Sequence, residues 1–457
     1  MITFSIIQKS QLEGVKRIDA EYYQPEHMVL AEKIRKLQNK SLKQISVIRS
    51  GTTPSDRDDA LEEGVVLLKT TDIRNNALSC SGNYYHITSK IAERMSKTKL
   101  DAKDVLVNIV GATLEVIGRV SFVPDNFPES NITQAMALLR IRDSDYLPEF
   151  IFAFLMCKYG KFQTDRLARP TGQFNLNLDE LGQVLIPQVL LRQQKDISEI
   201  IENVYEIQEN SKESYRRAEN LFLEELGFRN SKLRDDLSFA VNLSSVRKSN
   251  RVDSDFFQPK YQEIIEKIEK YNGGFDLIKN QFKQNKSLSK KDKEFYDYVE
   301  ISDVNVSNGE IIPNKIARGE IPANGKIVLH RGDLLISKVR PYRGAVSFID
   351  FEAENLLGSG AFTILQEKTD YKKEVLMIFL KLDFIKDLLL RYNCGTSYPV
   401  IKDEDILNLQ IPLINPDVQE EIVGLVKMSH EARKKSKELL EEAKRKIEEM
   451  IEKGSEN

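Results

Sequence analysis

One pattern is written twice along these 457 residues, and this internal repeat constrains the fold more than any other feature of the sequence. Residues 17–25 (RIDAEYYQP) recur as residues 251–259 (RVDSDFFQP), with four identities and five substitutions that each keep size or charge. The offset is 234 residues here, because 251 minus 17 is 234, and it falls to 225 where residues 186–187 match residues 411–412. Short insertions and deletions explain this drift. The repeat predicts two similar structural units in one chain.

A long helical pattern ends each copy. Residues recur in steps of three and four, the spacing of a coiled-coil seam, and both seams are polar in the middle. The seam positions are Ile197, Ile201, Val204, Gln208, Ser211, Tyr215, Ala218 and Phe222 in the first copy, and Ile422, Val426, Ser429, Arg433, Ser436, Leu440, Ala443 and Ile447 in the second. Each pattern runs for about thirty-three residues, which is roughly 50 Å of helix. We expect Gly227 and Gly454 to end the two helices.

Between the opening motif and the helix, each copy holds roughly 150 residues rich in short β-like runs. We therefore predict an α+β fold of two tandem pseudo-symmetric repeats, each a mixed α/β domain followed by a long helix. The two helices are expected to pack as an antiparallel coiled coil. The predicted boundaries are 1–187 for the first globular domain, 188–228 for the central long helix, 229–237 for a linker, 238–412 for the second globular domain and 413–457 for the C-terminal long helix.

The composition indicates a globular chain without a membrane segment. Hydrophobic residues make up 41% and charged residues 30%, so the chain can bury cores and still carry a charged surface. No run of eighteen apolar residues occurs, and the start lacks the apolar stretch of a secretory signal, so we expect a cytoplasmic protein. Cys80, Cys157 and Cys394 stand far apart, which argues against a disulfide framework and against a thiolate metal site.

The formal net charge of -3 does not by itself indicate nucleic-acid binding, so such a role must depend on local basic patches. Residues 279–293 hold six lysines against one aspartate, and residues 315–343 hold seven Lys or Arg against two acidic residues. A solvated charged loop is the alternative interpretation of either patch.

The loops differ between the two copies, whereas the expected strands and helices agree. Residues 51–55 (GTTPS) have no counterpart in the second copy, which has the lysine-rich loop instead. Two similar domains with different loops, joined by a rigid spacer, suit a protein that addresses two unlike DNA half-sites at a fixed separation.

Over residues 3 to about 453 the chain resembles the specificity subunits of Type I restriction-modification systems. The motifs that carry the resemblance are residues 51–55 (GTTPS), 67–73 (LLKTTDI), 104–113 (DVLVNIVGAT), 333–341 (DLLISKVRP) and 395–401 (GTSYPVI). Each motif is weak alone, but their duplicated order, followed by a helix each time, is specific. The missing GTTP turn leaves the details of the second recognition domain open.

The resemblance implies a DNA-binding subunit of a DNA-methylation and host-defence system. In that family each half is a target-recognition domain that reads one part of a split, asymmetric site on double-stranded DNA. The paired helices act as a ruler and dock methyltransferase (modification) subunits, two of them here. Those subunits would bring S-adenosylmethionine, and a separate restriction and translocase subunit would bring ATP, Mg²⁺ and cleavage, so no cofactor is expected in this chain.

No motif of a catalytic site is present in the sequence. The phosphate-binding loop, the dinucleotide-binding glycine pattern and the zinc-protease motif are all absent. The histidines, His27, His86, His330 and His430, lack the spacing of a metal site. Residues 415–418 (NPDV) fall short of the Asn-Pro-Pro-aromatic motif of the methylating partners and more simply open the second long helix. We therefore expect no catalysis and no metal.

Three other functions stay open at this point. The chain could be the recognition subunit of a system that fuses cleavage and methylation in its partner, which the sequence does not distinguish from Type I. It could be a methyltransferase or nuclease with an unfamiliar site. It could also be a coiled-coil scaffold whose globular repeats bind protein instead of DNA.

The candidate DNA contacts of the second half are mainly cationic. Arginine can bond both acceptors of a guanine edge or grip a phosphate, and hydroxyl groups suit either a base or a phosphate. An ordinary charged strand end is the alternative interpretation. These candidates are Lys286, Lys290, Lys338, Arg340, Tyr342, Arg343, Thr396, Ser397 and Tyr398.

The candidate contacts of the first half are more polar than cationic. Asparagine and glutamine suit adenine, and the hydroxyls and backbone amides of the 51–55 turn suit phosphate. A plain loop or turn is the alternative interpretation. These candidates are Thr52, Thr53, Ser55, Lys69, Asn108, Thr113, Arg119, Arg166, Arg169, Thr171, Gln173 and Asn175.

Overall fold

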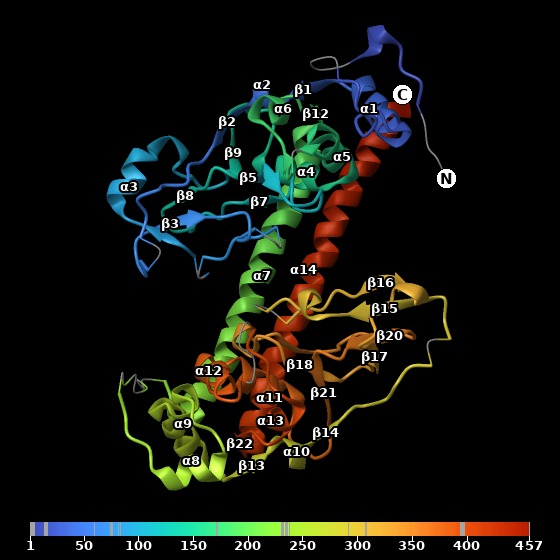
Figure 1. Ribbon diagram of the computed structural model, residues 1–457. Coiled ribbons are helices and arrows are strands. Elements are labelled where there is room, and N and C mark those ends of the chain that lie inside the picture. The colour runs from blue at the N-terminus through green and yellow to red at the C-terminus, as the bar shows by residue number, and fades with distance from the viewer. Residues whose placement is uncertain are drawn as a thin grey trace. The chain divides into compact units, whose positions relative to one another are not determined.

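The computed structural model describes residues 5–12, 17–58, 60–73, 76–80, 82, 84–170, 172–229, 233, 236, 238–290, 292–306, 309–393 and 398–456. Packing divides the chain into two compact units (Figure 1). Unit 1 comprises residues 1–210 and 431–457, and unit 2 comprises residues 211–430.

A four-stranded antiparallel sheet, in the order β2-β9-β5-β7, lies at the centre of unit 1. Its strands are β2 (Ser46–Ser50), β5 (Val105–Asn108), β7 (Val120–Phe122) and β9 (Met136–Ile141). A second sheet has the order β4-β3-β8, and β3 and β8 run parallel. Its strands are β3 (Val65–Leu68), β4 (His86–Ile87) and β8 (Ser130–Ile132). Two small pairings join segments that are far apart in sequence. One pairs β1 (Asn39–Ser41) with β12 (Leu185–Pro187), and the other pairs β6 (Val110–Gly111) with β11 (Phe174–Asn175), which also pairs with the nearby β10 (Arg169–Pro170).

Alternation along β5 explains why every residue of this strand is buried. Successive side chains of a strand point to opposite faces of the sheet. Val105 and Val107 belong to the core on the helical side, whereas Leu106 packs with Val66 and Leu68 of β3 on the other side. The central sheet therefore has a hydrophobic layer on both faces, which explains the apolar run Val105–Val107 in β5.

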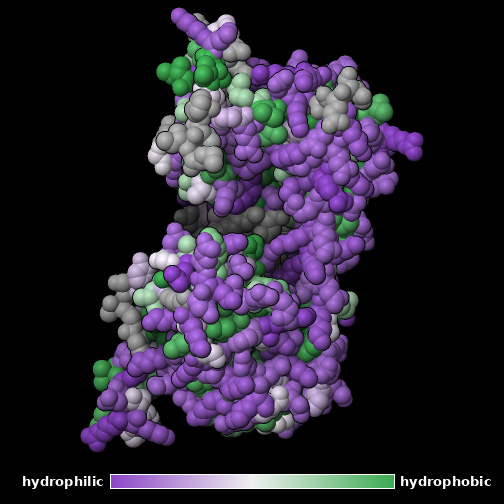
Figure 2. Space-filling model, turned by 90° about the vertical axis from the view of Figure 1, so that its right-hand side faces the viewer, coloured by the Kyte–Doolittle hydropathy of each residue, from purple (hydrophilic) through white to green (hydrophobic). Residues whose placement is uncertain are grey.

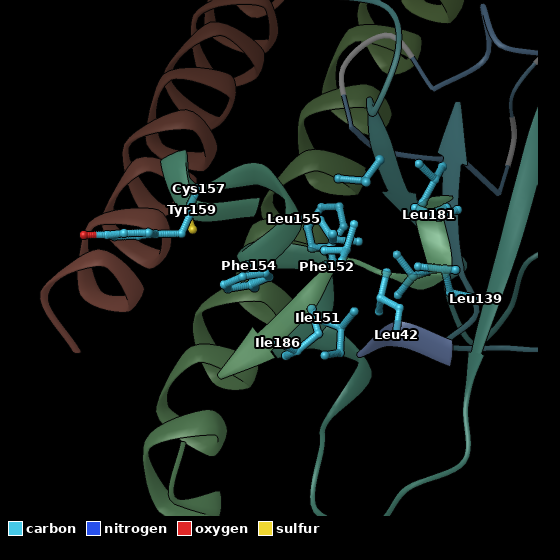
Figure 3. Packing of buried hydrophobic residues seen from close by; sticks show 14 of the residues in the cluster. Leu42, Leu139, Ile151, Phe152, Phe154, Leu155, Cys157, Tyr159, Leu181 and Ile186 are labelled. Atoms are coloured by element: carbon cyan, nitrogen blue, oxygen red, sulfur yellow. The ribbon is translucent and has the colours of Figure 1, made fainter. Parts of the chain in front are cut away.

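The helices of unit 1 form the layer on one face of the central sheet. They are α1 (Pro25–Lys36), α2 (Leu42–Ile45), α4 (Pro148–Met156), α5 (Lys158–Leu167) and α6 (Leu178–Gly182), while α3 (Ser89–Arg94) packs with the second sheet. Helix α4 is apolar apart from Glu149, because its side chains pack in the middle of this layer, with those of α2, β9 and β12 (Figure 3).

Unit 2 repeats this topology. Its central antiparallel sheet has the order β14-β21-β18-β19, and its second sheet has the order β16-β15-β20-β17 with β15 and β20 parallel. The strands are β14 (Phe282–Gln284), β15 (Phe295–Val299), β16 (Asn314–Ala317), β17 (Gly325–Val328), β18 (Leu334–Ser337), β19 (Val346–Phe348), β20 (Leu356–Ser359) and β21 (Phe362–Glu367). The helices are α8 (Leu243–Ser249), α9 (Pro259–Glu269), α10 (Ile278–Gln281), α11 (Lys373–Lys381), α12 (Asp383–Leu390) and α13 (Asp403–Leu407). The shared strand order confirms the predicted α+β repeat.

The pairing that closes each globular region is also repeated. In unit 1, β1 (Asn39–Ser41) pairs antiparallel with β12, and in unit 2, β13 (Phe275–Leu277) pairs antiparallel with β22 (Gln410–Pro412). In both cases the second strand ends on the Ile-Pro pair that the sequence repeats. Each pairing brings the chain back to the start of its globular region just before the long helix begins.

Two long helices, α7 (Leu191–Glu225) and α14 (Pro416–Glu456), contribute to both units. In unit 1, Ile197 and Ile201 share a core with Ala443 and Ile447, and in unit 2, Phe222 shares a core with residues 422–426. The start of α7 packs against the end of α14, and the end of α7 packs against the start of α14, so the helices are antiparallel, as predicted. Of the sixteen seam positions, all are buried except Gln208, Arg433 and Leu440, which are half-buried.

The polar middle of the seam is held by hydrogen bonds. In unit 1, Gln208 Nε2 donates to Ser436 Oγ at 2.9 Å. In unit 2, the hydroxyls of Ser211 and Ser429 lie 3.0 Å apart, and Ser211 Oγ also donates to the Ser429 carbonyl at 2.8 Å. These bonds satisfy polar groups that an apolar seam would leave without partners.

The two helices end differently. Gly227 has a left-handed φ of 66°, Phe228 N–H bonds to the Leu223 carbonyl and Gly227 N–H bonds to the Glu224 carbonyl. This is a Schellman end, as the sequence predicts for α7. The same prediction is wrong for Gly454, because α14 continues to Glu456. A Cβ at Gly454 would lie 3.0 Å from the Leu37 side chain, so this glycine packs closely against Leu37.

Within the described residues, no helix is long and apolar enough to cross a membrane.

Candidate nucleic-acid interface

In each unit, a short β pairing connects two segments that are distant in sequence. One is the loop after β5 in unit 1 or β18 in unit 2, and the other is the segment that precedes α6 in unit 1 or α13 in unit 2. In unit 1, β6 (Val110–Gly111) pairs with β11 (Phe174–Asn175), which pairs in turn with β10 (Arg169–Pro170). In unit 2, Val339 forms an antiparallel bridge with Val400. Two sets of candidate contacts that are about sixty residues apart in the sequence are thereby brought together in each unit.

Arg340 is the most constrained of the candidates in unit 2. Its φ of 50° lies in the left-handed region, which a residue other than glycine adopts at an energetic cost. Its N–H donates to the Pro399 carbonyl at 2.7 Å, and its guanidinium carbon lies 4.4 Å from the ring centroid of Tyr398. The backbone bond and the ring contact hold the guanidinium next to an exposed aromatic side chain. Such an arginine can present its planar fork to a base edge with little loss of conformational freedom.

Lys338 differs from Arg340 because a carboxylate neutralises it. Its ammonium lies 3.0 Å from Asp403 Oδ1, which also accepts a 2.6 Å hydrogen bond from Thr363 Oγ1. Burial acts to raise the pKa of Asp403, but the hydrogen bonds from Thr363 and Lys338 outweigh it and hold that pKa below the usual value. Lys338 therefore fixes the base of the loop, whereas Tyr342 and Arg343 on the single turn Pro341–Arg343 are exposed.

The corresponding loop of unit 1 is less cationic. Thr113 is exposed at its tip, where its carbonyl accepts from Val116 N–H, and Arg119 at its end is half-buried. Across the β6-β11 pairing, Gln173 and Asn175 are exposed. These side chains can donate and accept hydrogen bonds but bring little net charge.

Arg169 is tied to the same surface by an acidic residue. Its guanidinium forms an ion pair with Glu180 of α6, whose side chain is buried. The Arg169 side chain remains partly exposed, so it can take part in phosphate contacts while its position is set by Glu180.

The 51–55 turn lies next to this interface. Gly51 N–H donates to the Met136 carbonyl and Thr52 N–H to the Ile132 carbonyl, while Ile109 N–H bonds to the neighbouring Ala135 carbonyl. Residues 132–136 therefore hold the turn on one side and the β6 loop on the other. Thr52 and Ser55 are exposed and Thr53 is half-buried.

Lys69 follows β3 close to the same segment. Thr133 N–H donates to the Leu68 carbonyl, which fixes the end of β3 beside residues 132–136. The Lys69 ammonium lies 5.0 Å from the ring centroid of Tyr85. Lys69 is exposed and adds a cation at the edge of the unit 1 interface.

The lysine-rich loop of unit 2 takes the place of the 51–55 turn. It follows β14, and it runs along β17 through bonds from Val328 N–H to the Ser287 carbonyl and from Ser289 N–H to the Lys326 carbonyl, both 2.8 Å. Lys286 and Lys290 are exposed on it. The two units therefore place different chemistry at equivalent positions of the same fold.

Two of the predicted contacts are residues whose side chains are buried. Arg166 is 6% exposed, its Nε donates to the Tyr22 carbonyl at 2.7 Å, and its guanidinium carbon lies 3.9 Å from the Tyr22 ring centroid. Asn108 is fully buried, and its Nδ2 donates to the Thr70 carbonyl at 3.2 Å. Arg166 faces inward from α5, and Asn108 ends a strand that is covered on both faces. Both side chains make their contacts inside unit 1.

Three further candidates, Thr171, Thr396 and Ser397, lie outside the described residues. Reasoning from sequence missed the contribution of Asp403, which lies 65 residues beyond Lys338 and carries no motif. It also missed the contact between Arg340 and Tyr398. The internal repeat offers a signal for the second feature, because residues 339 and 400 correspond to the paired residues 110 and 175 at offsets of 229 and 225.

Nothing in the described part of the chain resembles a metal centre. The described His, Cys, Asp and Glu residues form no group of three or more that could hold an ion. Burial raises the pKa of the Cys157 thiol to about 12, so this cysteine is present as the unreactive thiol.

Comparison with known proteins gives the family. The family described as "Type I restriction modification DNA specificity domain" matches residues 34–219 and 269–442, which together are more than half of the chain.

Two curated relatives are similar over shorter stretches. The Type I restriction enzyme HindI specificity subunit of Haemophilus influenzae is 25% identical over 133 residues, which are 26% of this chain and 28% of that protein. The Type I restriction enzyme MjaVIII specificity subunit of Methanocaldococcus jannaschii is 30% identical over 131 residues, which are 27% of this chain and 30% of that protein. The similarity thus spans less than a third of the length of each relative.

Solved specificity subunits align over most of the chain. The S subunit of a Type I system from M. genitalium aligns with 92% of this chain and 95% of its own, with a TM-score of 0.42 and 13% identity. The HsdS subunit from Thermoanaerobacter tengcongensis aligns with 92% and 96%, with a TM-score of 0.28 and 15% identity. Because the family matches both repeats and more than half of the residues, this protein belongs to the Type I restriction modification DNA specificity domain family.

Proposed function

We propose that this chain is the non-catalytic specificity subunit of a Type I restriction-modification enzyme and that it reads a bipartite, asymmetric DNA site. One observation carries this proposal. In both units the same β pairing joins two distant loops into one surface, and the side chains on the two surfaces differ. A shared frame with different surface chemistry is what two unlike half-sites require.

Those side chains predict which bases each unit reads. Unit 2 presents Arg340, Arg343 and the lysines of residues 286–290, which suit guanine edges and phosphates. Unit 1 presents Thr113, Gln173 and Asn175, which suit adenine edges through paired donors and acceptors. We expect the half-site of unit 2 to be richer in guanine than the half-site of unit 1.

Partner subunits would supply the chemistry. Two modification subunits would bring S-adenosylmethionine, and a restriction and translocase subunit would bring ATP and Mg²⁺, all acting on cytoplasmic DNA. The long antiparallel helices would set the separation of the half-sites and contact the modification subunits. Their hydrogen-bonded polar seam supports a spacer role, because polar groups inside a coiled coil specify register and partner.

Sequencing of methylated bases tests the proposal. Genomic DNA is compared between cells that carry this chain with its modification subunit and cells that lack only this chain. A split, asymmetric methylated motif that is present in the first strain and absent from the second is the expected result. An identical methylation pattern in both strains, with the modification subunit active in each, would overturn the proposal.

A further inference from the structure

An exposed leucine lies in the middle of the lysine-rich loop of unit 2. Leu288 is 68% exposed, and Lys286 and Lys290 lie two residues before and two residues after it. Single exposed apolar residues are common on protein surfaces, and those on the face drawn in Figure 2 lie in small, separate patches. Exposure alone therefore assigns no role to Leu288. Its surroundings do, because the loop holds this side chain in one place between two cations.

The backbone on both sides of Leu288 is hydrogen-bonded to β17. Ser287 and Ser289 each share a 2.8 Å backbone hydrogen bond with this strand, and Leu288 between them forms an antiparallel bridge with Ile327. This pairing extends the second sheet of unit 2 beyond β17. The backbone that carries the leucine is therefore part of a sheet edge, although it belongs to a loop.

A buried asparagine fixes the start of the loop. Asn285 is 5% exposed, and its Nδ2 donates to the Val328 carbonyl and to Asp333 Oδ2, both at 2.9 Å. Its Oδ1 accepts a 3.0 Å hydrogen bond from Ser287 N–H. These bonds set the course of the chain immediately before Leu288. A loop that is held in this way loses little conformational freedom when it binds a ligand.

The loop leaves the central sheet at the same edge as the segment that carries Arg340. Strands β14 and β18 both pair antiparallel with β21, so they run in the same direction and the chain leaves both at one edge of the sheet. Gln284, at the end of β14, hydrogen-bonds the Asp403 carboxylate, which is also the partner of Lys338. Leu288 and Arg340 therefore belong to two loops of one candidate interface.

Charge favours nucleic acid as the ligand of this loop. Residues 279–293 hold six lysines against one aspartate. Lys286 and Lys290 are exposed, and within the described residues no carboxylate pairs with either of them. Their ammonium groups can therefore neutralise phosphates, as the DNA backbone requires.

The chemistry of leucine limits what it can read on DNA. Its side chain has no hydrogen-bond donor or acceptor, so it bonds neither to the polar groups of base edges nor to phosphate oxygens. The apolar group that base pairs present in the major groove is the C5-methyl of thymine. A leucine held between two phosphate-binding cations can cover such a methyl group and remove it from water.

We propose that Leu288 reads a thymine of the unit 2 half-site through its C5-methyl group, while Lys286 and Lys290 hold the neighbouring phosphates. This inference rests on the proposed function, because it takes the split DNA site as the ligand. It adds a base-reading residue without a polar group, and it adds thymine to a half-site whose other candidate contacts are mainly cationic.

Replacement of thymidine by deoxyuridine tests the inference, because the two nucleotides pair alike and differ only in the methyl group. The full-length chain is purified with its modification subunit. Its affinity is measured for duplexes of the methylated motif in which each thymine of the unit 2 half-site, on either strand, is replaced in turn. We expect one replacement to weaken binding about 3- to 5-fold, which is the effect of one lost methyl contact. Leu288→Ala should weaken binding to the thymine duplex by at least as much and should bind both duplexes equally.

Two further variants are controls. Lys286→Ala should weaken binding to all duplexes alike and reduce its salt dependence, while the preference for thymine stays. Ile312→Ala truncates another exposed aliphatic side chain of unit 2 and should keep both the affinity and the preference. Because Leu288 and Ile312 are both exposed, neither truncation is expected to move the thermal midpoint.

The outcomes distinguish this inference from the proposed function. A wild-type complex that binds every replaced duplex as tightly as the original would overturn the inference alone. A Leu288→Ala complex that keeps the preference for thymine, or that loses affinity for all duplexes without any preference in the wild type, would do the same. A wild-type complex that binds the motif no more tightly than an unrelated duplex would overturn the proposed function as well.

Discussion

The guanidinium carbon of Arg340 lies 4.4 Å from the ring centroid of Tyr398, although 58 residues separate the two in the sequence. The bond from Arg340 N–H to the Pro399 carbonyl fixes the same contact through the backbone. The relationship gives the loop after β18 a single conformation and an arginine with a defined direction. It is the basis of the first prediction.

Removal of the Arg340 side chain should relax specificity at one position of one half-site. Arg340→Ala keeps a residue that is strained at the same φ and removes the guanidinium with its aliphatic stem, so we expect a loss of about 1–3 kcal/mol of discrimination against the wrong base. Sequencing of methylated bases should show this position becoming degenerate while the other half-site is unchanged. Arg331→Ala, which removes an exposed arginine near the other end of β18, is the matched control and should leave the motif intact. Degeneracy in the other half-site would contradict the assignment of Arg340 to its own half-site.

The ion pair of Lys338 and Asp403 should make the stability of unit 2 depend on pH. The pKa of Asp403 is lower in the folded chain than its ordinary 3.8, so the carboxylate stabilises the fold above that pH and loses its contribution as the pH falls through the folded value. Asp403→Asn should cost about 1 kcal/mol at pH 7, since the pair is partly exposed and screened by solvent. The difference in urea midpoint between the variant and the wild type should shrink below pH 3.8. A difference that stays constant across this range would show that the charge of Asp403 contributes nothing.

The hydroxyls of Ser211 and Ser429 should be energetically coupled. Ser211→Ala removes one partner and leaves a buried hydroxyl with fewer partners, so we expect a loss of about 1 kcal/mol. The double variant, with alanine at both positions, should cost less than the sum of the two single variants by about 0.5 kcal/mol or more. Urea unfolding of the four chains in a double-mutant cycle measures this coupling. Strictly additive losses would mean that the two hydroxyls act independently.

Gly51 should tolerate no side chain. A Cβ there would lie 1.8 Å from the Ile132 carbonyl oxygen, which is a backbone atom that cannot rotate away, so Gly51→Ala must displace the 51–55 turn. We expect a loss of more than about 2 kcal/mol of stability, together with altered reading of the half-site of unit 1. Gly424→Ala in α14 is the opposite case, because nothing lies within 4 Å of its added Cβ and alanine favours helix by about 1 kcal/mol. Thermal unfolding of the two variants should give shifts of opposite sign.

The repeat, the long helices and their seam could be predicted from the sequence because their signals are local. The positions from Ile197 to Phe222 recur at helical spacing, and the side chains at that spacing are the ones that pack. The runs that became β5 and β18 were visible for the same reason, since a strand buried on both faces is apolar throughout. Half of each candidate interface was visible too, because cations and polar residues at strand ends need no partner to be recognised.

The remaining features depend on which distant segments meet, and only the tertiary structure decided them. Arg166 and Gln173 are equally good candidates in the sequence. Arg166 lies on the inward face of α5 and is buried, whereas Gln173 lies in the loop before α6 and is exposed. Gly454 looks like a helix stop in the sequence, yet α14 continues past it to Glu456. The sequence by itself determined two copies of one fold joined by antiparallel helices. Which side chains face solvent at each interface was settled by contacts between segments tens of residues apart, and no local periodicity encodes such contacts.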